Sequence, residues 1–192
     1  MPKTPQYLQA PSGKPEAPPA GLSFRQLSGK QGSRGQVVLV MVDDDEEDCL
    51  LVKEALKLAC TGCTFHCVLD GAEMMDYLNR AGRYSDPETS PVPDLILLDL
   101  NLPKMGGREV LRRVKTDPRF RAIPVIILTT SRELEDVKAC YALGANSYIT
   151  KLPSFDELVE AMKTLAEYWI EIATLPHRKA RTLGPIDPDK LS

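Results

Sequence analysis

Five residues suited to phosphate chemistry each follow a short strand-like run of the sequence. Asp43 and Asp44 follow residues 37–42, Asp99 follows 95–98, Thr129 follows 125–128, and Lys151 follows 147–150. Three carboxylates brought together repel one another unless a cation lies among them, and a hard divalent ion with oxygen ligands relieves that repulsion. Mg²⁺ fits best, because it keeps several waters, takes one or two carboxylates and binds phosphate oxygens. Lys151 and Thr129 then supply a cation and a hydroxyl donor for a phosphoryl group.

Asp99 is the best candidate nucleophile in this set. An Asp carboxylate attacks phosphorus to form an acyl phosphate, while a metal ion and a lysine neutralise charge on the transferred oxygens. Asp99 ends the most apolar run and precedes the turn at residues 100–103, whose backbone carbonyls can reach the metal and whose proline fixes the exit path. The sequence therefore predicts phosphoryl transfer to Asp99.

These residues meet only if the runs before them are parallel strands. The expected strands are residues 37–42, 65–69, 95–98, 125–128 and 147–150, and the expected helices are roughly 46–59, 72–81, 108–115, 132–143 and 155–173. Capping boxes are expected at Asp70 with Glu73, Thr130 with Glu133 and Ser154 with Glu157. The alternation predicts an α/β fold with a five-stranded, doubly wound parallel sheet of flavodoxin-like order, which binds ligands beyond the carboxyl ends of its strands.

The composition favours one soluble domain with extensions. Residues 1–36 hold six prolines and five glycines, which predicts a flexible extension before a domain at 37–175 and a tail at 176–192. That extension carries a net charge of +4, which leaves −7 for the rest of a chain whose total is −3. A domain of that charge is a poor partner for nucleic acid.

The chain shows no sign of a membrane or secreted location. No apolar run approaches the ~18 residues of a spanning helix, and no signal-peptide core lies near Met1, so we expect a cytoplasmic protein without a membrane partner. Five cysteines without a secretion signal favour reduced thiols. Cys60, Cys63, His66 and Cys67 leave a zinc site or a Cys60–Cys63 redox pair as alternatives to simple core positions.

Four motifs resemble those of response-regulator receiver domains of two-component systems. They are VDDDEED at 42–48, DLILLDLNLPKMGG at 94–107, PVIILTT at 124–130 and NSYITK at 146–151, and the resemblance covers residues 37–175. The loop before Asp94, the segment KTDPRFRAIPVIILTTS and the ending YWIEIATLP are most similar to small single-domain regulators that pair with bacterial phytochrome-type sensor kinases.

The resemblance implies a role for each site residue. Asp99 becomes the phosphoacceptor, Asp44 a direct Mg²⁺ ligand, Asp43 a holder of the ion's waters, Asn101 a ligand through its backbone carbonyl, Thr129 the switch hydroxyl, Tyr148 the aromatic that turns inward with it, and Lys151 the phosphoryl-binding lysine. The chain departs from the family where Leu152 separates Lys151 from Pro153, so no cis bond is expected at Lys151. Thr130 is bulkier than the residue usual beside the switch threonine, which narrows access to Asp99.

The expected function is a switch rather than an enzyme. A sensor histidine kinase phosphorylates Asp99, the surface changes, and the signal passes by protein–protein contact, with autodephosphorylation resetting the switch. An aspartyl-phosphate phosphatase of haloacid-dehalogenase type is an alternative, but it needs a second Asp where this chain has Asn101. A binding module that is never phosphorylated is another. The remaining acids of the run, Asp45 to Asp48, are assigned to helix capping and solvation.

The last expected helix carries a second apolar stripe. Phe155, Leu158, Met162, Leu165 and Trp169 form a stripe for the sheet, and Ala161, Tyr168, Ile172 and Leu175 form another. The second stripe predicts a homodimer through the last helix and tail, with the tail folding back over the stripe as the alternative.

Overall fold

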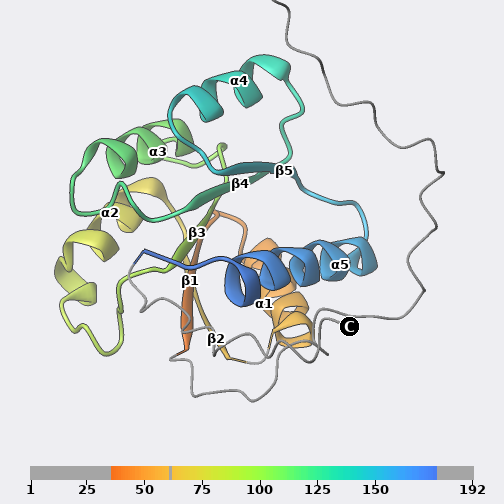
Figure 1. The fold of residues 1–192 in the computed structure, drawn as a ribbon. Coiled ribbons are helices and arrows are strands. Elements are labelled where there is room, and N and C mark those ends of the chain that lie inside the picture. Colours follow the sequence, from red (N-terminus) through yellow and green to blue (C-terminus); the bar gives the residue numbers. More distant parts are fainter. Residues whose placement is uncertain (1–35, 61, 177–192) are drawn as a thin grey trace, which may run out of the picture. The chain divides into compact units, whose positions relative to one another are not determined.

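The structure is a computed structural model that describes residues 36–60 and 62–176 (Figure 1). The predicted extension, apart from Gln36, and the predicted tail after residue 176 therefore lie outside the described residues. No helix in the described part is long and apolar enough to cross a membrane.

The described residues form a five-stranded parallel sheet in the order β2-β1-β3-β4-β5. The strands are β1 (Val37–Val42), β2 (Cys63–Val68), β3 (Leu95–Leu98), β4 (Val125–Thr129) and β5 (Ser147–Thr150). This order confirms the doubly wound, flavodoxin-like fold. The chain leaves β1 toward β2 on one side and then returns to place β3 on the other, so the order reverses beside the end of β1.

Helices cover both faces of this sheet (Figure 1). They are α1 (Glu46–Ala59), α2 (Gly71–Asn79), α3 (Gly107–Thr116), α4 (Leu134–Ala142) and α5 (Phe155–Ala166), with a 3₁₀ turn η2 (Gly82–Tyr84) and a π-helical segment η3 (Glu167–Ile172). Side chains alternate along β1, so Leu39 and Met41 pack with α1 and α5, whereas Val40 and Val42 pack with α2 and α3. The sheet is thus buried on both sides, which explains its continuous apolar strands.

Side-chain caps fix the starts of α1, α2 and α5, whereas α3 and α4 have none. Asp70 accepts a hydrogen bond from the Glu73 amide at 2.7 Å, and Ser154 accepts one from the Glu157 amide at 3.3 Å, as expected. The capping box expected at Thr130 is wrong, because α4 begins only at Leu134 and its N-cap makes no side-chain hydrogen bond. Instead Asp136, in the first turn of α4, pairs with Arg108 of α3. The first turn of α4 is therefore held by this tertiary contact together with a local one, from the Ser131 hydroxyl to Asp136.

The apolar stripes of the final helix are partly as expected. Leu158, Met162, Leu165 and Trp169 pack in the cluster between α1, α5 and the sheet. Phe155 was placed there wrongly: it is 40% exposed, in the first turn of α5 beside Leu51 and Leu152. Two members of the second stripe are also wrong: Leu175 is buried, at 3% exposure, and Ala161 packs against the core cluster. The exposed part of the second stripe is Tyr168 at 53% and Ile172 at 48%.

The cysteines differ from the reduced thiols that the sequence favours. In the structure, one disulfide joins Cys49 of α1 to Cys67 of β2, and another joins Cys60, at the end of α1, to Cys63 of β2. Cys140 is free and buried. Sulfur atoms joined in this way are not metal ligands, so the zinc alternative has no support here. Of the alternatives drawn from the sequence, the Cys60–Cys63 pair is the one that the structure forms.

Candidate functional site

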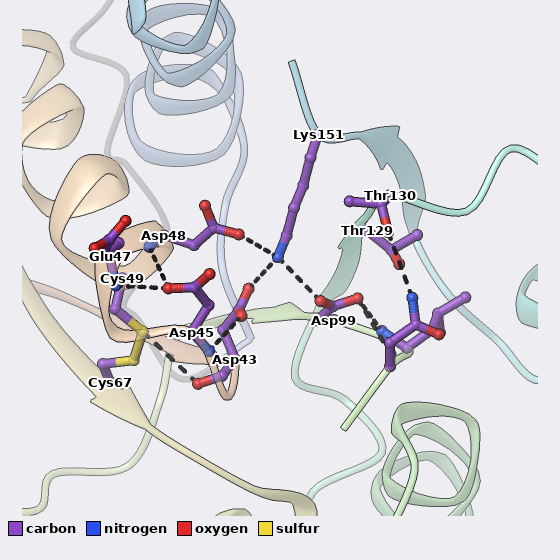
Figure 2. A network of polar contacts seen from close by, with 12 residues as sticks. Asp43, Asp45, Glu47, Asp48, Cys49, Cys67, Asp99, Thr129, Thr130 and Lys151 are labelled. Atoms are coloured by element: carbon purple, nitrogen blue, oxygen red, sulfur yellow. Dashed lines mark hydrogen bonds and ion pairs between the residues drawn. A yellow bond between two sulfur atoms is a disulfide. The ribbon is translucent and has the colours of Figure 1, made fainter. Parts of the chain in front are cut away.

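The carboxyl ends of four strands bring the candidate residues to one edge of the sheet (Figure 2). Asp43 follows β1, Asp99 follows β3, Thr129 ends β4 and Lys151 follows β5. The Lys151 ammonium nitrogen lies 2.7 Å from Asp43 Oδ2 and 3.0 Å from Asp99 Oδ2. The Lys151 ammonium therefore faces carboxylates that follow two adjacent strands, β1 and β3.

Backbone hydrogen bonds position these side chains. The Asp99 amide donates to the Val42 carbonyl at 3.0 Å, and the Lys151 amide donates to the Thr129 carbonyl at 2.8 Å. Asp99 Oδ1 then accepts the backbone amides of Leu100 at 2.6 Å and Asn101 at 3.2 Å. The turn after β3 thus occupies Oδ1, whereas Oδ2 is directed toward Lys151.

The acidic residues fit a hard divalent cation. One carboxylate oxygen from each of Asp43, Asp44 and Asp99 lies within 4.8 Å of the others, which is close enough for one ion. Asp43 is fully buried, and its Oδ2 receives no well-directed hydrogen bond even though the Lys151 charge is near. A metal ion stabilises a buried carboxylate oxygen that lacks a well-directed hydrogen bond, and oxygen ligands suit Mg²⁺ or a similar ion.

Burial and the lysine set the protonation of the site in opposite directions. Burial raises the pKa of Asp43 above its usual value, and the nearby Lys151 ammonium and the hydrogen bond from the Asp45 amide offset only part of that effect. Burial also acts to raise the pKa of Asp99, but hydrogen bonds from Thr129 and Lys151 outweigh it and hold that pKa below its usual value. Burial would lower the pKa of Lys151, yet its carboxylate partners raise it. Asp99 is therefore an ionised carboxylate beside a permanent cation.

The remaining candidates surround Asp99 on the side of β4 and β5. Thr129 is fully buried, and Tyr148 is half-buried and donates its hydroxyl hydrogen bond to the Ser131 carbonyl at 3.1 Å. Asn101 Nδ2 reaches the Thr130 hydroxyl at 3.5 Å, so two exposed side chains touch beside Asp99. No peptide bond in the described part is cis, which agrees with the expectation for Lys151.

Asp48 has a contact that the sequence pattern does not predict. The pattern assigns Asp48 to capping and solvation, but its side chain is only 34% exposed and its Oδ2 lies 2.6 Å from Lys151 Nζ. Asp45 is the residue that caps α1, through the amides of Glu47 and Asp48. The spacing from the cap to Asp48 was visible in the sequence, whereas the direction of α1 relative to β5 was not.

Comparison with known proteins gives a consistent result. Residues 38–163 match the family profile described as the response regulator receiver domain. The response regulator Rcp1 of Synechocystis sp. is 42% identical over 139 residues, which is 72% of this chain and 92% of the relative.

Solved structures show the same similarity. The phosphorylated cyanobacterial phytochrome response regulator RcpA is 41% identical and superposes with a TM-score of 0.69, over 74% of this chain and 99% of the other. The Mn²⁺-bound form of Rcp1 is 41% identical with a TM-score of 0.67, over 73% and 99% of the two chains.

Proposed function

Because the chain belongs to the response-regulator receiver family, we propose that it is a phosphorylation switch in which Asp99 accepts the phosphoryl group of a sensor histidine kinase. The observation that carries this proposal is the environment of Asp99. Two backbone amides occupy Oδ1, while Oδ2 lies 3.0 Å from the Lys151 ammonium. One oxygen is held and the other is presented beside a cation, which is the arrangement that an attack on phosphorus needs.

The transfer forms one bond and breaks one. An Asp99 oxygen attacks phosphorus, the bond from phosphorus to the donor imidazole nitrogen breaks, and that nitrogen keeps the electron pair. Lys151 and the Thr129 hydroxyl then contact the transferred oxygens. Asp43, Asp44, Asp99 and the Asn101 backbone carbonyl would hold Mg²⁺, which would supply further positive charge to those oxygens.

The similarity to Rcp1 and RcpA supports a phytochrome-type kinase as the donor. A phosphotransfer profile against purified sensor kinases tests this pairing, and preferential transfer from a kinase of another class would contradict it. The net charge of −7 outside residues 1–36 supports output through protein contact rather than through nucleic acid. Asn101, in the place of a general acid, argues against a phosphatase that turns over small esters.

The first test is metal-dependent labelling of the wild-type protein. Acetyl phosphate with Mg²⁺ should label it, and a chelator should stop the reaction. Asp44→Ala should weaken Mg²⁺ binding about tenfold or more and slow labelling, because one of the clustered carboxylates is lost. The same variant should stabilise the metal-free protein slightly by relieving carboxylate repulsion. Calorimetric titration with Mg²⁺ measures the affinity directly, and an unchanged affinity would remove Asp44 from the ligand set.

The lifetime of the label separates the proposed switch from its rivals. A persistent label that decays slowly supports a switch with autodephosphorylation, rapid turnover supports the phosphatase, and no label supports an inert module.

Tyr148 reports the conformational step in the same reaction, because a Thr129 that moves toward the phosphoryl group vacates space for the ring. Tyr148 resonances that stay identical before and after labelling would contradict this coupling.

We also propose a homodimer through the last helix, where Tyr168 and Ile172 form an exposed apolar patch. One patch that meets its own copy closes a two-fold symmetric dimer without a second surface. The Tyr168 ring stands edge-on to Trp169 at 5.1 Å, so the half-buried Trp169 supports an aromatic anchor at the surface. Truncating such an anchor costs roughly 2 kcal/mol of binding free energy.

The dimer prediction is tested by sedimentation of Tyr168→Ala combined with Ile172→Ser. We expect a shift toward the monomer with intact helical content. The matched control is Leu134→Ser, which removes an exposed apolar side chain from α4 and should leave the mass unchanged. A wild-type protein that is monomeric at high concentration, with and without phosphorylation, would rule this interface out.

A further inference from the structure

Lys151 has a third carboxylate partner that comes from a different layer of the fold. Its nitrogen lies 2.6 Å from Asp48 Oδ2, closer than to Asp43 or Asp99. Asp48 belongs to α1, on one face of the sheet, whereas Lys151 follows the edge strand β5 (Figure 2). This ion pair joins residues that are 103 positions apart in the sequence.

The start of α1 is built so that Asp48 faces the site. The Asp45 carboxylate accepts the Glu47 amide at 2.8 Å and the Asp48 amide at 3.4 Å, which fixes the first turn. The Asp45 amide in turn donates to Asp43 Oδ1 at 3.1 Å, so the cap is tied to the end of β1. Asp48 therefore reaches Lys151 from a helix turn that is itself held by the site.

Unlike the other two partners of Lys151, Asp48 is neither a candidate metal ligand nor the proposed phosphoacceptor. Asp43 and Asp99 belong to the carboxylate cluster that fits a metal ion, and Asp99 is the proposed acceptor. Asp48 lies outside that cluster. An ammonium group has three protons, so Lys151 can keep one on Asp48 while another turns to a phosphoryl oxygen.

The surroundings strengthen this ion pair. Asp48 and Lys151 lie together at a groove of about 90 Å³ whose walls include Leu51, Val52 and Leu128. The Lys151 side chain is only 16% exposed. Apolar walls and limited water make the attraction between two charges stronger and hold the pair in one geometry.

We propose that Asp48 is a positioning residue that holds the Lys151 ammonium beside Asp99 during phosphoryl transfer. This inference rests on the proposed function, since it assigns a role within the same reaction. In the test reaction an Asp99 oxygen attacks the phosphorus of acetyl phosphate, the phosphorus–oxygen bond to the acetyl group breaks, and acetate leaves with the electron pair. The Lys151 ammonium must contact the phosphoryl oxygens in the transition state, and the ion pair with Asp48 holds the ammonium in that position.

The test compares the labelling kinetics of Asp48→Ala, Asp48→Asn and Asp48→Glu with the wild type, using acetyl phosphate and Mg²⁺. We expect the maximal rate of Asp48→Ala to fall about tenfold, which is the size of one charge-assisted hydrogen bond. The half-saturating acetyl phosphate concentration should change less than about twofold, because the contact matters most in the transition state. Asp48→Asn keeps the shape without the charge and should be intermediate, and Asp48→Glu should recover part of the rate.

The matched control is Glu47→Ala, which removes the same charge from the same helix turn. Glu47 is exposed, whereas Asp48 contacts Lys151, so this variant should label at the wild-type rate. In a Lys151→Ala background, Asp48→Ala should have no further effect, because Asp48 acts through the lysine. In the metal-free protein, the Lys151 side-chain ammonium resonance should broaden in Asp48→Ala and persist in Glu47→Ala.

The outcomes separate this proposal from the function on which it rests. An unlabelled wild type overturns the proposed function itself. A labelled wild type with an Asp48→Ala rate that is unchanged or faster overturns the positioning role, and a faster rate shows that the carboxylate repels the phosphodonor. An equal loss in the Lys151→Ala background overturns it as well. Circular dichroism of each variant identifies misfolding, and Asp48→Asn, the least disruptive change, then decides.

Discussion

Asp99→Asn should lose labelling by acetyl phosphate by a factor of at least about a hundred while the fold is retained. The amide has nearly the shape of the carboxylate but is a poor nucleophile. Its oxygen can keep the hydrogen bonds from the Leu100 and Asn101 amides, which places its NH₂ group where Oδ2 lies 3.0 Å from the Lys151 ammonium. Two donors then face each other, so the variant also loses the attraction that orders the lysine.

Intact-mass spectrometry measures the label, and thermal unfolding reports the fold. Asp76→Asn is a suitable control, because it makes the same chemical change at an exposed residue of α2. That control should label like the wild type. Labelling of Asp99→Asn at the wild-type rate would place the phosphoacceptor at another residue.

The second large effect is expected at Gly107, the first residue of α3. A Cβ atom there would meet the Asp99 carbonyl oxygen and lie 2.8 Å from Leu100 Cα, so Gly107→Ala must displace the backbone that carries the acceptor. The Gly107 amide also donates to the Leu100 carbonyl at 3.1 Å, which leaves the helix start little room to move away. We expect a loss of about 3 kcal/mol of unfolding free energy, together with slower labelling.

The neighbouring glycine provides the matched control. A Cβ on Gly106 would lie 3.9 Å from its nearest neighbour, the Leu100 carbonyl oxygen, and the residue has an ordinary φ of −64°. Gly106→Ala should therefore cost less than about 1 kcal/mol, mainly through the weaker N-cap of α3. Urea unfolding of both variants measures the difference. Equal stabilities of Gly107→Ala and Gly106→Ala would show that the backbone at Asp99 moves to accommodate the added Cβ at little cost in free energy.

The sequence was a good guide to the sheet and to the residues at its carboxyl edge. Residues 37–42 and 95–98 are continuous apolar runs because both faces of a parallel sheet are buried, and β1 and β3 have those bounds in the structure. Parallel strands point their carboxyl ends to one edge, so naming the strands was enough to bring Asp43, Asp99 and Lys151 together. The bounds of these strands and the residues that follow them depend on the local pattern of apolar residues, which a single sequence contains.

Only the tertiary structure decided contacts between layers. Asp48 reaches Lys151 because α1 crosses the sheet in a particular direction. In the first turn of α4, Asp136 pairs with Arg108 of the neighbouring helix α3. Phe155 matched the periodicity of the core stripe but lies in the first turn of α5 and is exposed, whereas Leu175 is buried. Periodicity defines the faces of a helix, but the partner that covers each face depends on the position of distant chain segments, and the sequence pattern does not encode that position locally.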